Sequence, residues 1–91
     1  MSSERLKRVK ELIREEKALE ARKLFNDIEP EESVNYYFTK GVLEQKFQNL
    51  GDAINAFSKV VEMDPDNTEA KNNLHIIQNI LNFWNPDMFN P

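Results

Sequence analysis

The chain has 91 residues, of which 40% are hydrophobic and 31% are charged, and its net charge is −4. This length favours one small domain, and the composition is typical of a globular protein rather than a disordered one. Because there is no cysteine, disulfides, thiolate catalysis and cysteine-based metal sites are excluded. No apolar run could span a bilayer or act as a signal peptide. We therefore expect no membrane insertion, and a cytoplasmic protein or one whose leader has been removed.

The charge is unevenly distributed along the chain. Residues 4–14 hold five basic and two acidic side chains, a net +3, which leaves −7 for the rest of the chain. A basic first helix on an acidic body is therefore expected. Nucleic acid could contact such a helix, but the acidic whole makes nucleic-acid binding the weaker interpretation and a solvated basic helix the simpler one.

The first 30 residues predict a helical hairpin. Its first helix is expected to begin near Ser3 as N-cap, a turn is expected at residues 15–17, and the second helix is expected to end before Pro30. Apolar residues recur at intervals of three and four in both helices. The two buried stripes are Leu6, Val9, Leu12 and Ile13, then Ala18, Ala21, Leu24, Phe25 and Ile28.

A second hairpin is expected after Ser33, the predicted N-cap of the third helix. Gly41 lies in the middle of that helix, where glycine costs about 1 kcal/mol relative to alanine, so we expect another backbone to pack against it. Residues 48–51 predict a turn that includes Gly51. Asp52 is expected to start the fourth helix, where a carboxylate suits the helix dipole.

The fifth helix is expected to be capped by Thr68 and to run to about Trp84. It carries two neighbouring apolar stripes: Leu74, Ile77, Leu81 and Trp84, then Ile76, Ile80 and Phe83. This is more apolar surface than packing on one side requires. The extended tail 85–91 adds Met88 and Phe89, which we expect to seal the end of the fifth helix or to dock on another molecule.

A repeat pattern links these elements. In a 34-residue unit that starts at Val34, an aromatic residue falls at the fourth position, glycine at the eighth, leucine at the seventeenth, alanine at the twentieth, phenylalanine at the twenty-fourth and proline at the thirty-second. These residues are Tyr37, Gly41, Leu50, Ala53, Phe57 and Pro65. The unit resembles the tetratricopeptide repeat (TPR). Lys40 and Glu44 depart from the pattern, because leucine and tyrosine are expected there.

The resemblance implies an all-α fold: a right-handed helical-repeat array of five helices, built as two helix-turn-helix repeats and a capping helix. Residues 2–33 look like a degenerate first repeat and residues 34–67 like an intact second one. Residues 68–84 resemble a capping helix. We treat the 91 residues as a single TPR-like domain.

The resemblance also implies a concave groove, lined by the first helix of each hairpin, that holds a peptide or a partner helix. The residues implied by repeat position are Leu6, Lys10, Ile13, Asn35, Phe38, Val42, Gln45, Asn72, Ile76 and Asn79. Packing of the apolar members on one another is the alternative. Lys10, Arg14 and Asn35 partly match the variety of the family that grips an acidic C-terminal peptide, although the full set is not matched.

No arrangement for catalysis or for a cofactor is recognised. Asp64, Asp66 and Thr68 alternate as in a calcium loop, but the glycine and glutamate that such a loop needs are replaced by Glu69 and His75. Helix capping explains these residues better, and His75 is read as an ordinary helix residue. We therefore expect a non-enzymatic, adaptor-like or co-chaperone-like module that binds another protein or a peptide. The alternative is a homo-oligomer, such as a homodimer, formed through the fifth helix and the tail.

Overall fold

The computed structural model describes residues 2–84, all of whose regular structure is helical. The predicted all-α class and its five helices are confirmed. In chain order they are α1 (Ser2–Arg14), α2 (Ala18–Asn26), α3 (Val34–Lys46), α4 (Leu50–Met63) and α5 (Thr68–Trp84). In this part of the chain, no helix is long and apolar enough to cross a membrane. Our predictions for the tail 85–91, with Met88 and Phe89, and for the Trp84 side chain lie outside the described residues.

The two hairpins turn in the same way. At the end of α1 the backbone N–H of Lys17 donates to the carbonyl of Leu12, 2.8 Å away, and at the end of α3 that of Asn49 donates to Glu44, 2.9 Å away. These bonds between residues five apart define a helix end with a left-handed residue before the donor. Here that residue is Glu16, with φ 64°, and Gln48, with φ 65°, although glycine usually holds the position.

The turn predicted at residues 48–51 is therefore misplaced. Gly51 lies inside α4 and has no positive φ, because α4 begins at Leu50, and Asp52 lies in the first turn of α4 as predicted. The prediction assumed that a glycine marks the turn, whereas the hydrogen bonds of the α3 end place it at Gln48. Gly51 is instead exposed, with open space around its Cα.

Side-chain caps fix the starts of α3 and α5. The predicted cap of α3 is confirmed, because the Ser33 hydroxyl accepts a hydrogen bond from the backbone N–H of Tyr36 at 3.1 Å. The predicted cap of α5 is wrong. Thr68 is already the first residue of that helix, and Asn67 caps it by accepting from the Ala70 N–H at 2.9 Å. An asparagine at this position satisfies a donor that the first helical turn leaves unpaired.

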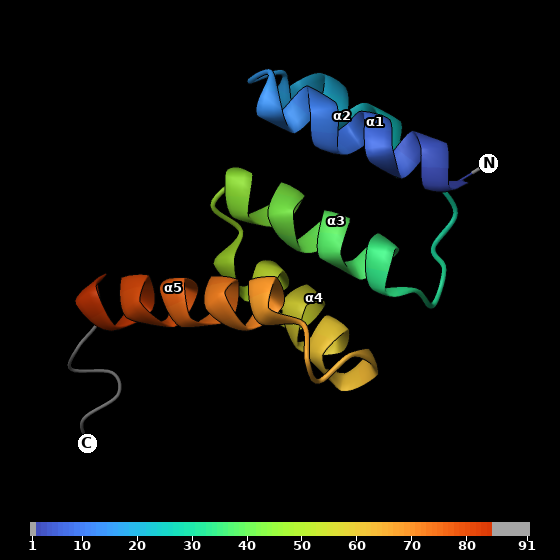
Figure 1. Ribbon diagram of the computed structural model, residues 1–91. Helices are drawn as coiled ribbons and strands as arrows, with labels where there is room; N and C mark the ends of the chain where they lie inside the picture. Colours follow the sequence, from blue (N-terminus) through green and yellow to red (C-terminus); the bar gives the residue numbers. More distant parts are fainter. Residues whose placement is uncertain (1, 85–91) are drawn as a thin grey trace.

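The core is divided into two clusters that meet at α3, which lies between α1 and α5 in Figure 1. The first lies among α1, α2 and α3, where the Phe25 and Tyr36 rings stack at 5.1 Å. The second lies among α3, α4 and α5 and centres on Phe57 and Ile77, both fully buried. Tyr37 and Val42 of α3 pack against both clusters. Burial on two sides thus makes α3 the central helix.

Gly41 of α3 lies against the ring of Phe57 of α4. A Cβ atom at Gly41 would lie 2.7 Å from Cε1 of Phe57, closer than carbon atoms can approach without a shift. The prediction that Gly41 makes room for a neighbour is thus right in kind, but the neighbour is an aromatic ring and not a backbone. The same ring packs edge-on against Phe38 at 5.6 Å and is completely buried, so it has little freedom to move.

Gly41→Ala should therefore destabilise the protein by about 1–3 kcal/mol, because overpacking outweighs the gain in helix propensity. Gly51→Ala is the matched control, since it meets nothing within 4 Å. It should be neutral or stabilising by up to about 1 kcal/mol. Urea denaturation of both variants measures the difference. Equal free energies of unfolding for the two variants would show that the Phe57 ring does not constrain Gly41.

Gln48→Gly should stabilise the fold by up to about 1 kcal/mol, since glycine adopts a positive φ without steric strain. Gln78→Gly, in the exposed interior of α5, is the control and should destabilise by about 1 kcal/mol. Thermal denaturation distinguishes them. A lower melting temperature for Gln48→Gly would contradict the left-handed turn.

Candidate functional site

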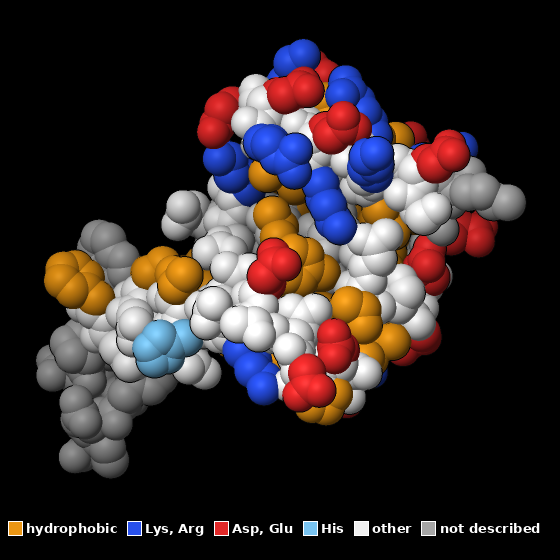
Figure 2. Space-filling model, viewed as in Figure 1, with side chains coloured by type: hydrophobic (Ala, Val, Ile, Leu, Met, Phe, Trp, Pro, Cys, Tyr) orange, Lys and Arg blue, Asp and Glu red, His pale blue; other side chains and the backbone are white. Residues whose placement is uncertain are grey.

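A concave site lies between α1, α3 and the beginning of α5. Its cavity volume is about 650 Å³, within the range of ligand-binding clefts. In Figure 2, hydrophobic side chains are visible there between the basic side chains over α1 and the acidic side chains around the beginning of α5. The lining residues are Lys10, Ile13 and Arg14 of α1, Val34, Asn35, Phe38 and Val42 of α3, and Asn67 and Glu69.

Lys10 links two sides of this cavity. Its Nζ donates a hydrogen bond to Oδ1 of Asn35 at 2.8 Å and lies 5.8 Å from the centre of the Phe38 ring. Partial burial lowers the pKa of Lys10 from its ordinary value, and the negative charge of Glu69 opposes that shift. The ammonium thus lies over an apolar surface with an amide oxygen as its hydrogen-bond partner.

A second, smaller cavity of about 430 Å³ adjoins the first. It is lined by Val42, Gln45, Lys46, Gln48, Leu50 and Ile80, so Val42 belongs to both cavities. We call the two together the groove. Along α3 it runs from Asn35 through Phe38 and Val42 to Gln45, a length of about 15 Å at about 1.5 Å per helical residue. The groove is apolar in its middle and carries an amide at each end.

The structure brings together six of the ten residues predicted for the site. Lys10, Ile13, Asn35, Phe38 and Val42 line the first cavity, and Gln45 lines the second. Leu6 does not line either cavity, because it is 1% exposed and belongs to the core under α1. Asn72, Ile76 and Asn79 are exposed on α5 outside both linings.

On α5 the predicted positions missed the residues that line the groove. Glu69 lines the first cavity and Ile80 the second. These two residues are eleven positions apart and lie on one face of the helix, because eleven residues complete three turns. The prediction from repeat positions selected Asn72, Ile76 and Asn79, which lie between these two residues in the sequence, and it omitted Glu69. Its spacing of seven from the predicted Ile76 was the signal that could have found it. Val34 and Asn67 also line the first cavity and were not predicted, and Arg14, which was considered only for an acidic C-terminal peptide, lines it as well.

The segment that was considered for calcium binding leads into α5 and contributes to the capping of that helix. Asn67 donates from its amide to the Asp64 carboxylate at 3.5 Å while its oxygen caps the helix. Across residues 2–84, no group of three or more histidine, aspartate or glutamate side chains is placed to hold a metal ion. His75 is exposed on α5.

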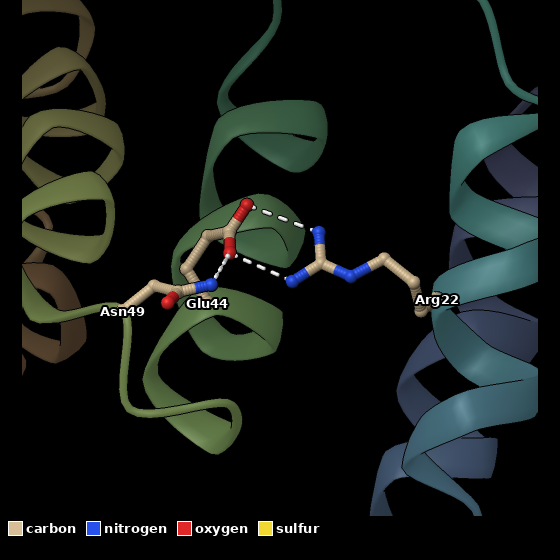
Figure 3. Close-up of polar contacts among 3 residues, drawn as sticks. All are labelled: Arg22, Glu44 and Asn49. Atoms are coloured by element: carbon tan, nitrogen blue, oxygen red, sulfur yellow. Dashed lines mark hydrogen bonds and ion pairs between the residues drawn. The ribbon is translucent and has the colours of Figure 1, made fainter.

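The tightest polar cluster lies on another side of α3. Glu44 is 7% exposed, and Arg22 of α2 donates to both of its carboxylate oxygens, at 2.7 and 3.1 Å (Figure 3). The side-chain amide of Asn49 donates to the same carboxylate at 3.0 Å. The Arg22 guanidinium also lies 4.6 Å from the centre of the Phe47 ring. These hydrogen bonds, Arg22 first, lower the pKa of Glu44 from its ordinary value.

This cluster is structural rather than part of the groove. Glu44 follows Val42 by two residues, which turns it about 200° around the helix, away from the groove. Its carboxylate is satisfied by three hydrogen bonds and ties α2 to α3 and to the α3–α4 turn. The departure of Glu44 from the repeat pattern is thereby explained, because Arg22 supplies the compensating charge at a buried position.

No family model, curated protein or solved structure matches the chain. The resemblance to tetratricopeptide repeats therefore stays a prediction from the sequence pattern.

Glu44→Gln should destabilise the protein by about 1–3 kcal/mol at neutral pH, because it leaves Arg22 without its counter-charge. The native fold lowers the pKa of Glu44 below its ordinary value of 4.5. The carboxylate therefore contributes stability above that value and loses it as the pH falls through the lowered pKa. The difference in unfolding free energy between wild type and variant should shrink as the pH falls from neutral to below 4.5 and through the lowered pKa of Glu44.

Urea denaturation across this pH range measures that difference. Glu62→Gln, an exposed carboxylate on α4, is the control and should change stability by no more than about 0.5 kcal/mol. A difference for Glu44→Gln that is constant with pH would argue against an ionised Glu44–Arg22 pair.

Proposed function

We propose that this chain is a non-enzymatic, TPR-like interaction module that binds a short segment of another protein in the groove. The observation that carries the proposal is the first cavity, in which Lys10, Asn35 and Phe38 from two helices converge beside Val42. An apolar cleft with a few polar groups placed around it is the usual form of a binding site.

An extended peptide fits this groove better than a helix. An extended segment of about five residues matches the 15 Å length of the groove at roughly 3.1–3.3 Å per residue. Extended backbone also leaves its N–H and C=O groups unpaired, and the amides of Asn35, Gln45 and Gln48 can pair with them. The proposed ligand is therefore an unstructured segment with apolar side chains. The homo-oligomer remains a second proposal, supported by Ile76, which is 48% exposed on the outer helix of the array.

A display library of random heptapeptides tests the groove without a known partner. The immobilised full chain should enrich peptides with apolar residues, and Val42→Glu should weaken their binding by about tenfold or more, since it places a charge at the centre of the groove. Asn35→Ala should weaken binding about threefold to tenfold by removing one amide. Fluorescence anisotropy of a selected peptide measures each change.

Leu19→Glu is the control, because Leu19 is 72% exposed on α2 and lies outside both cavity linings. It should leave peptide binding unchanged. Circular dichroism confirms that each variant is folded. The groove would be refuted if no selected peptide bound the Val42→Glu variant more weakly than the wild type. Sedimentation over a range of concentrations tests the oligomer, and a strict monomer would exclude it.

A further inference from the structure

The two edges of the first cavity carry opposite charges. Lys10 and Arg14 project from α1 on one edge, and Glu69 comes from α5 on the other. α3 lies between these helices in Figure 1, and its Phe38 and Val42 form the apolar middle of the cavity. At this cavity in Figure 2, hydrophobic side chains lie between basic side chains over α1 and acidic side chains around the beginning of α5. The cavity thus presents a cation, an apolar surface and an anion in sequence across its width.

These charges do not neutralise one another. Lys10 and Glu69 interact electrostatically, but among residues 2–84 none of Lys10, Arg14 and Glu69 takes part in a salt bridge, and the hydrogen-bond partner of Lys10 is the amide of Asn35. A lysine ammonium has three donors, and the bond to Asn35 uses one of them. The Glu69 carboxylate is acceptor-only and is likewise available. Both edges can therefore form charged hydrogen bonds with a bound molecule.

An extended ligand can meet all three surfaces at once. The polyproline II conformation has three residues per turn, so three consecutive side chains point in three directions about 120° apart. One can point to the apolar middle while its neighbours point to the two edges. A purely acidic peptide would bring like charge against Glu69, and a purely basic one would do so against Lys10 and Arg14, which is unfavourable in a partly desolvated site.

We propose that the groove recognises an internal peptide segment in which one acidic and one basic side chain lie within two residues of an apolar one, the acid toward Lys10 and Arg14 and the base toward Glu69. This inference rests on the proposed function and specifies the ligand class. The apolar residue supplies contact area, and the two charges fix which residue faces which helix. The segment needs no free chain end, because the contacts are made by side chains.

A charge exchange across the groove tests the arrangement. The double variant Lys10→Glu/Glu69→Lys makes the α5 edge basic and places an acid beside Arg14 on the α1 edge, at constant net charge. A peptide selected by the wild type from the heptapeptide library should bind this variant about tenfold more weakly, the combined effect of two partly exposed ion pairs. The same peptide with its acid and base exchanged should bind the double variant more tightly than the original peptide does, and less tightly than the original binds the wild type, because Arg14 is unchanged.

The matched control is Lys7→Glu/Glu62→Lys, which exchanges charges at two exposed positions outside both cavity linings. It should leave the binding of both peptides unchanged. Glu69→Lys alone provides a second variant that keeps Lys10 and its bond to Asn35. It should change the preferred residue facing α5 from basic to acidic in a new selection.

Each outcome bears on one proposal or the other. Enriched peptides with apolar residues but no paired charges, or with acids alone, would overturn the charge arrangement and leave the groove intact. Selected peptides that fail to follow the charge exchange would overturn it as well. A library that yields no groove-dependent peptide would refute the proposed function itself.

Discussion

The structure depends on the position of α3 between two cores. This helix contacts α1 and α2 through Tyr36 and Leu43 and contacts α4 and α5 through Phe38 and Val42. A helix buried on two sides leaves little volume at its contacts, which is why Gly41 lies against the Phe57 ring with no room for a methyl group. Neither hairpin can bury both of its faces alone. They form one folded unit because α3 of the second hairpin also packs against the first.

The Arg22–Glu44 pair also holds the first hairpin against α3, through polar rather than apolar contacts. A core of this size is limited, and a buried carboxylate between α2 and α3 is tolerated because both of its oxygens accept hydrogen bonds and Arg22 supplies the opposite charge. Such a pair is directional, whereas apolar contacts are not. Its bidentate geometry fixes how the first hairpin sits on α3, and therefore how Lys10 and Arg14 sit over the groove.

The groove lies where the neighbouring helices leave α3 uncovered. Phe38 and Val42 are only partly buried, because α1 and α5 lie on either side of α3 and leave its outer face open. The uneven distribution of charge along the chain is seen at this groove. The basic first helix and the acidic start of α5 face each other across one apolar strip. One edge of the site is therefore basic and the other acidic.

The sequence by itself determined the helical class, the five helices and the cap at Ser33, since these follow from local periodicity and turn chemistry. The resemblance to the repeat family also pointed to most of the α3 side of the groove, since Asn35, Phe38, Val42 and Gln45 lie on one helical face whatever their neighbours are. Only the tertiary structure decided that Leu6 is buried, that Glu69 replaces Asn72 in the lining, and that Glu44 meets Arg22. Each of these depends on the angle and register between helices distant in the chain. Packing of whole side-chain surfaces sets that register, and it leaves no fixed spacing in the sequence.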